Sequence, residues 1–156
     1  MGYVSDMRKI IGKKPLLIVA CAVYIFDKKG RVLLQNRADD FSWGAPGGSM
    51  DLGETLEETA RREVYEETGL TLGEIKLLNV LSGEDSHFFY PNGDEAYAVD
   101  INFTCYDYEG EVKIQKEEVL KVDFFELDNL PKNLGKIDKK VLEEIKNKGL
   151  NFKKRA

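Results

Sequence analysis

The chain has 156 residues, a length suited to one domain with one hydrophobic core. Hydrophobic residues make up 42% and charged residues 33%, a composition that is typical of globular proteins and excludes a disordered or fibrous one. The formal net charge of -5 argues against a general basic surface for nucleic acid. The whole negative excess lies within residues 48–70, which hold seven acids and two bases.

The first part of the chain predicts two strands and a loop. An apolar run over 16–26 indicates a buried strand, and a turn at 27–30 joins it to a second strand over 31–36. We therefore expect a hairpin at the start of the domain. Glycines and a proline mark residues 41–53 as a loop.

The residues after this loop carry the clearest helix signal. Thr55 and Glu58 form a capping box, in which each side chain bonds the backbone N–H of the other residue. No glycine or proline interrupts the run to Thr68, and Gly69 follows where helices commonly end in a left-handed residue. The sequence therefore predicts a helix over 56–68.

The second half of the chain predicts strands and a closing helix. The expected elements are strands over 75–81, 87–90, 97–105 and 119–127 and a helix over 138–148. Apolar and polar residues alternate over 97–105, so we expect one apolar and one polar face for this strand. Mixed strands flanked by two helices predict an α/β layered fold.

Cysteine and membrane signals are weak. Cys21 and Cys105 are far apart in sequence and lie in apolar runs, which favours two buried thiols in a reducing cytoplasm. The apolar run at 16–26 is much shorter than the roughly 20 residues that a membrane-spanning helix needs. We therefore expect a cytoplasmic protein with no membrane partner.

Three glutamates gather on one side of the predicted helix. At about 100° per residue, Glu63, Glu66 and Glu67 fall together within an arc of roughly 100°. Like charges one turn apart repel, and negative charge is unfavourable at a helix C-terminus. A divalent cation such as Mg²⁺ offsets this cost, because it prefers carboxylate oxygens. The alternative is a solvated acidic face, since Glu is a good helix former.

The segment GGSMDLGETLEETARREVYEETGL at 47–70 resembles the Nudix box, which is written GX5EX7REUXEEXGU with U an aliphatic residue. The defined positions are filled without a gap by Gly48, Glu54, Arg62, Glu63, Val64, Glu66, Glu67, Gly69 and Leu70. The resemblance implies a single Nudix domain over 1–156, with its core at about 16–148. It also implies the Nudix fold, an α/β/α sandwich with a mixed β-sheet.

The resemblance implies a hydrolase of phosphoric anhydride bonds that cleaves a nucleoside diphosphate linked to a further group X, with Mg²⁺ or Mn²⁺ as cofactor. Water attacks phosphorus in such a reaction, so charge must be neutralised and a proton removed. The implied metal ligands are Glu63, Glu66, Glu67 and Gly48. Glu66 and Glu54 are candidates for ordering the water or accepting its proton, and Arg62 for holding a glutamate in position.

Five residues outside the box are candidates for substrate binding. Arg37 follows the second strand and could pair with a phosphate, or be an ordinary surface charge. Trp43 and Tyr90 could stack on a base, although aromatic residues are more often part of a core. Glu117 and Glu118 precede a strand, about where some Nudix relatives contribute a further carboxylate, and a solvated turn is the alternative.

The substrate and the oligomeric state stay open at this level. We expect a small-molecule nucleotide partner and no stable nucleic-acid complex, with a homodimer as one option. Two other functions compete: a catalytically silent nucleotide sensor of the Nudix type, and a MutT-type enzyme that clears oxidised nucleotides. The complete set of box carboxylates argues against the sensor.

Overall fold

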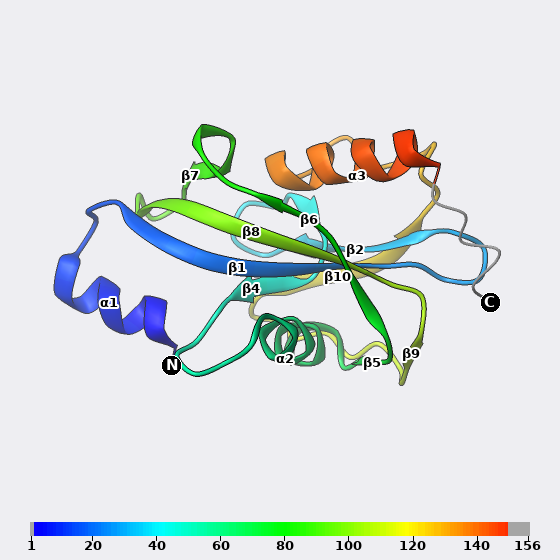
Figure 1. Cartoon of the computed structure of the whole chain (residues 1–156), viewed down its shortest axis with the longest axis horizontal. Helices are drawn as coiled ribbons and strands as arrows, with labels where there is room; N and C mark the ends of the chain where they lie inside the picture. The colour runs from blue at the N-terminus through cyan, green and yellow to red at the C-terminus, as the bar shows by residue number, and fades with distance from the viewer. Residues whose placement is uncertain (1, 150–156) are drawn as a thin grey trace.

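Two helices cover opposite sides of the strands (Figure 1). The computed structural model describes residues 2–149, so residues 1 and 150–156 of the predicted domain lie outside it. Helix α2 (Leu56–Thr68) lies below the strands in the view of Figure 1, and helix α3 (Lys136–Lys148) lies above them. The predicted α/β/α layering is confirmed.

The larger sheet is built around a central parallel pair of strands. Its strands in spatial order are β4 (Gly47–Ser49), β1 (Leu16–Ile25), β8 (Glu95–Cys105) and β6 (Ile75–Leu81), with β7 (His87–Phe89) also pairing with β8. β1 and β8 run parallel from Leu16 opposite Ala96 to Ile25 opposite Cys105. The other pairings in this sheet are antiparallel, so the sheet is mixed as predicted.

The second sheet corrects the predicted hairpin. β2 (Val32–Arg37) pairs with β10 (Val119–Phe125) and with β3 (Trp43–Gly44). It packs against β1, but its only backbone pairing on that side within residues 2–149 is an isolated bridge between Val32 and Phe26, the residue after β1. The two edges of β1 are already taken by β4 and β8. After the turn that follows β1, the chain therefore enters a different sheet as β2.

Short elements complete the fold. Helix α1 (Tyr3–Ile11) precedes β1 and was not predicted from the sequence. Strand β5 (Thr71–Leu72) pairs with β9 (Tyr108–Glu109), and a 3-10 turn at Glu84–Ser86 precedes β7. No helix within the described residues is long and apolar enough to cross a bilayer.

The predicted ends of α2 are confirmed. The Thr55 hydroxyl accepts a hydrogen bond from the Glu58 N–H at 3.1 Å, and the Glu58 carboxylate accepts one from the Thr55 N–H at 2.8 Å. Gly69 ends the helix with φ 78°, a left-handed conformation that glycine adopts without strain. These two local signals fix where α2 begins and ends.

The core has one cluster beneath each long helix and a third, smaller cluster of Ile18, Ala96 and Ala98. Ala60 and Val64 of α2 pack in the first cluster, and Val141, Leu142 and Ile145 of α3 pack in the second. The strands between them are covered on both faces, so Asn102 and Thr104 of the predicted polar face of β8 are buried, whereas Asp100 is half-buried.

The buried Asn102 of β8 uses its donor group in a hydrogen bond, whereas its Oδ1 has no hydrogen-bond partner among the described residues. Asn102 is 1% exposed and donates to the Asn79 side chain at 2.9 Å. Asn79 in turn donates to Glu144 of α3 at 2.7 Å. A short polar relay therefore connects the central strand to the outer helix.

Candidate active site

Strand β4 brings a glycine against the acidic side of α2. Gly48 pairs with Cys21 of β1, so its backbone is held by the larger sheet. A Cβ atom placed on Gly48 would lie 2.4 Å from Cδ of Glu63 and 2.6 Å from each of its oxygens. Only glycine leaves room for this carboxylate beside the strand.

Arg62 links Glu54, in the loop before α2, to Glu63 and Glu66 of the helix. Its Nε donates to Glu54 at 2.6 Å and its Nη2 donates to the other Glu54 oxygen at 2.9 Å, which makes a two-bond pair. Its Nη1 donates to Glu63 at 2.8 Å and to Glu66 at 3.4 Å. The hydrogen bonds from Arg62 are the main reason that the pKa of Glu54 is lowered to about 2.

Glu67 lies deeper than the other glutamates. It is 5% exposed and accepts hydrogen bonds from the Gln35 side chain and, at 3.4 Å, from the Gly47 N–H. Burial raises the pKa of Glu67 to about 8, and the negative charges of Glu63 and Glu118 add to the rise. Burial also raises the pKa of Glu63.

The chemistry of these donors fits a divalent cation. Glu63, Glu66 and Glu67 supply carboxylate oxygens from one helix side, and burial makes two of these charges costly unless a positive charge compensates them. Across residues 2–149, however, no three acidic, histidine or cysteine side chains converge closely enough to enclose an ion. Arg62 is the positive charge that contacts Glu63 and Glu66 in this conformation.

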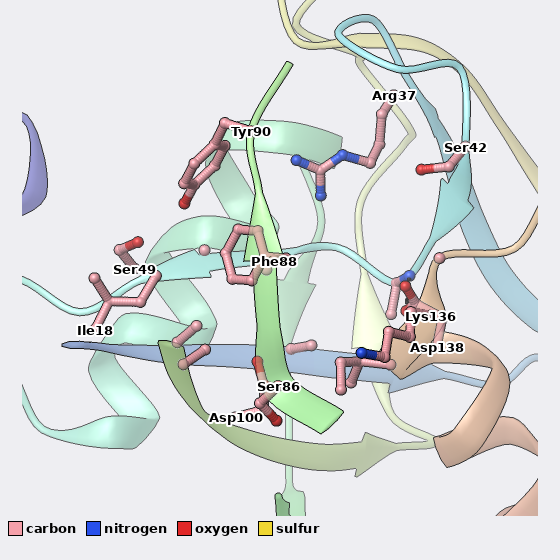
Figure 2. Close-up of a pocket in the computed structure, with 18 of the residues that line it drawn as sticks. Ile18, Arg37, Ser42, Ser49, Ser86, Phe88, Tyr90, Asp100, Lys136 and Asp138 are labelled. Carbon is pink, nitrogen blue, oxygen red and sulfur yellow. Dashed lines mark hydrogen bonds between the residues drawn. The ribbon is translucent and has the colours of Figure 1, made fainter. Parts of the chain in front are cut away.

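A pocket of about 380 Å³ lies beside strand β4, and no residue of α2 lines it. Gly47, Gly48 and Ser49 of β4 line it, so the pocket and the glutamates share one strand. Figure 2 shows the side chains that surround the space. They include Arg37, Phe88, Tyr90, Lys136, Asp100 and Asp138.

The pocket wall combines aromatic rings with charged groups. Phe88 and Tyr90 meet edge to face with ring centroids 4.9 Å apart. Arg37 extends toward the space from the opposite side in Figure 2, and it also pairs with Asp39 at 3.2 Å. Lys136 reaches in from the start of α3.

Asp138 connects three segments of the pocket wall through hydrogen bonds. Its carboxylate accepts hydrogen bonds from the Tyr24 hydroxyl at 2.9 Å and from the Ala45 N–H at 2.9 Å. These contacts join α3, β1 and the segment between β3 and β4. Burial raises the pKa of Asp138, and the two hydrogen bonds oppose that rise.

The structure brings some of the predicted substrate residues to the pocket and not others. Arg37 and Tyr90 line it. Trp43 packs against Phe125 in the core beneath α3, with ring centroids 5.0 Å apart, so its side chain is engaged away from the pocket. Glu117 is exposed on the turn before β10, whereas the charge of Glu118 is close enough to Glu67 to raise its pKa.

Sequence reasoning missed four residues that the fold places at the site. They are Gln35, Phe88, Asp100 and Lys136. Gln35 had a usable signal, since it is a polar residue at the end of the apolar run Val32–Leu34. The other three come together only through the pairing of β7 with β8 and the packing of α3, which no local pattern indicates.

The chain belongs to the Nudix family, because the NUDIX domain model matches residues 16–145. It is similar to the ADP-ribose pyrophosphatase of Methanocaldococcus jannaschii, with 36% identity over 135 residues that cover 80% of this chain and 76% of that protein. It is also similar to the oxidized purine nucleoside triphosphate hydrolase of Danio rerio, with 33% identity over 105 residues that cover 65% of this chain and 62% of that protein.

Solved structures agree with this assignment. The MutT NUDIX hydrolase from Burkholderia pseudomallei is 29% identical and superposes with a TM-score of 0.71, covering 83% of this chain and 98% of that chain. The predicted Nudix fold and the predicted class, a hydrolase acting on phosphoric anhydride bonds, are therefore confirmed.

Proposed function

We propose that the protein hydrolyses a nucleoside diphosphate linked to a second group X, with Mg²⁺ or Mn²⁺ as the metal ion. One observation carries this proposal: the pocket and the acidic side of α2 share Gly47 and Gly48. A nucleotide seated in the pocket would therefore extend its diphosphate along β4 toward the glutamates.

In this proposal Glu63, Glu66, Glu67 and the Gly48 carbonyl hold the metal ion. The bound ion would neutralise phosphate charge and so favour attack by water. Arg62 keeps Glu54 and Glu63 in place through the bonds described above. The glycine at position 48 allows the Glu63 carboxylate to lie beside the backbone.

The contacts of the glutamates favour Glu66 over Glu54 as the proton acceptor. Both oxygens of Glu54 are bonded to Arg62, and a carboxylate whose pKa is about 2 is a weak base. Glu66 has a 51% exposed side chain and a single 3.4 Å contact with Arg62. It is therefore free to meet water at the edge of the site.

The pocket supports recognition of a nucleoside. Phe88 and Tyr90 offer aromatic faces and edges against which a base could pack. Arg37 and Lys136 supply positive charge on the opposite side of the space, which suits phosphate or a polar group X. Two relatives are named an ADP-ribose pyrophosphatase and an oxidized purine nucleoside triphosphate hydrolase. ADP-ribose and oxidised purine nucleoside triphosphates are therefore the first substrates to test.

The proposal is tested with a substrate panel and product analysis. The purified protein is incubated with Mg²⁺ or Mn²⁺ and ADP-ribose, dinucleotides, nucleotide sugars, ordinary triphosphates or oxidised guanine triphosphate, and products are separated by chromatography. We expect two phosphate-containing products from at least one diphosphate derivative. Turnover confined to oxidised triphosphates would favour the MutT-type function, and tight binding without turnover would favour the sensor. A cytoplasmic location, a homodimer and the absence of a nucleic-acid complex stay predictions.

A further inference from the structure

We infer that Gln35 is a positioning residue for Glu67, an inference that rests on the proposed metal site. Gln35 belongs to β2 in the second sheet, whereas Glu67 belongs to the last turn of α2. The Gln35 Nε2 donates a hydrogen bond to Oε2 of Glu67, and each of these residues is 5% exposed. Water therefore competes little for this bond.

The bonds to Glu67 leave one of its two oxygens for a cation. Oε2 accepts from the Gln35 amide and from the Gly47 N–H at 3.4 Å. Both donors are protein groups held by strands, one in each sheet. Two donors on the same oxygen restrict rotation of the carboxylate, so Oε1 is the oxygen that remains for metal binding.

Packing alone does not account for an amide at this position. Leu33, two residues earlier on the same face of β2, is fully buried in the cluster beneath α2. An apolar side chain would extend that cluster, whereas the Gln35 Oε1 is buried without a hydrogen-bond partner among the described residues. A buried acceptor without a partner is unfavourable, so Oε1 does not explain why glutamine occupies this position. The Nε2 group, which donates to Glu67, does.

The test compares Gln35→Met with a matched control on the same strand. Methionine keeps the length of the side chain and removes the donor, whereas Leu33→Val removes one buried methylene from the same face. Mn²⁺ affinity is measured by electron paramagnetic resonance, and apo stability by thermal melting. We expect Gln35→Met to weaken Mn²⁺ binding by about 10- to 100-fold. The apo melting temperature should also fall, because the buried Glu67 Oε2 keeps only the Gly47 N–H as a donor among the described residues. Leu33→Val should lower the melting temperature and leave Mn²⁺ affinity unchanged.

A double-mutant cycle separates positioning from an independent effect. If Gln35 acts through Glu67, Gln35→Met should cause no further loss of Mn²⁺ affinity once Glu67→Gln is present. Wild-type Mn²⁺ affinity in folded Gln35→Met, or an equal loss in both backgrounds, would overturn the inference. If the wild-type protein itself binds no Mn²⁺, the proposed metal site fails and the inference fails with it. Tight wild-type binding with an unaffected Gln35→Met variant would leave the metal site intact and reject only the role of Gln35.

Discussion

Gly48 and Glu63 face each other so closely that the glycine has no space for a side chain. The atom that a Cβ on Gly48 would meet is the carboxyl end of a flexible side chain, which can move aside. We therefore expect Gly48→Ala to fold with nearly unchanged stability while displacing the Glu63 carboxylate. Turnover should fall by about 10²- to 10³-fold, as for loss of one placed electrostatic group. Steady-state kinetics together with thermal melting will measure both effects.

Gly47→Ala provides the contrasting control. A Cβ on Gly47 would lie 2.1 Å from the backbone oxygen of Cys21 and 2.7 Å from Cα of Ala22, and backbone cannot move aside as a side chain can. This variant should lose stability first, with a lower melting temperature or no folded protein. Equal melting temperatures for the two alanine variants would contradict the explanation.

Glu67→Gln should separate stability from activity. The substitution keeps the size of the side chain and removes a buried charge whose pKa is raised by burial, so apo stability should hold or rise. If Glu67 is a metal ligand, turnover should fall by about 10²-fold or more and metal affinity should weaken. Retention of wild-type turnover at limiting Mg²⁺ would refute the assignment of Glu67 as a ligand.

Removal of divalent cations should abolish turnover on any substrate, because no positive ion then neutralises the substrate phosphates beside the carboxylates of Glu63 and Glu67. Addition of Mg²⁺ should raise the melting temperature of the chelator-treated protein, since a ligand that binds only the folded state stabilises it by mass action. Differential scanning fluorimetry across a Mg²⁺ titration will show the shift. Full turnover in excess chelator would exclude the metal-dependent mechanism.

Asp138→Asn should change how stability depends on pH. Burial raises the pKa of Asp138 in the folded state, so its favourable contribution is complete below the unfolded pKa of ~4 and is lost as pH rises through the folded value. Asparagine cannot ionise, and its side-chain oxygen can still accept from Tyr24 and Ala45. The two proteins should melt at similar temperatures in acid, and the variant should gain relative to wild type toward neutral pH. A melting-temperature difference that stays constant from pH 4 to 8 would count against this account.

The elements that the sequence predicted correctly are those whose signals are local. The capping box at Thr55 and the glycine at Gly69 defined α2, and the box spacing placed Glu63 and Glu67 on one helix. The partners of these glutamates were not predictable in the same way. Gln35 contacts Glu67 because β2 lies in the second sheet, where it pairs with β10 instead of β1. Such contacts depend on which strands pair, and strand choice is decided by the whole fold.

The parallel pairing of β1 with β8 also has a consequence for how the chain folds. β4 follows β1 closely in the sequence, so these two strands can pair early in synthesis. The β8 residues that pair with Leu16 and Ile25 are Ala96 and Cys105, which are synthesised much later. Contacts between residues so far apart in sequence form slowly, because a long loop must close first. During translation the apolar β1 therefore has an open edge until most of the chain has been made. Substitutions that weaken the pairing of β8 with β1 should therefore increase aggregation of nascent chains.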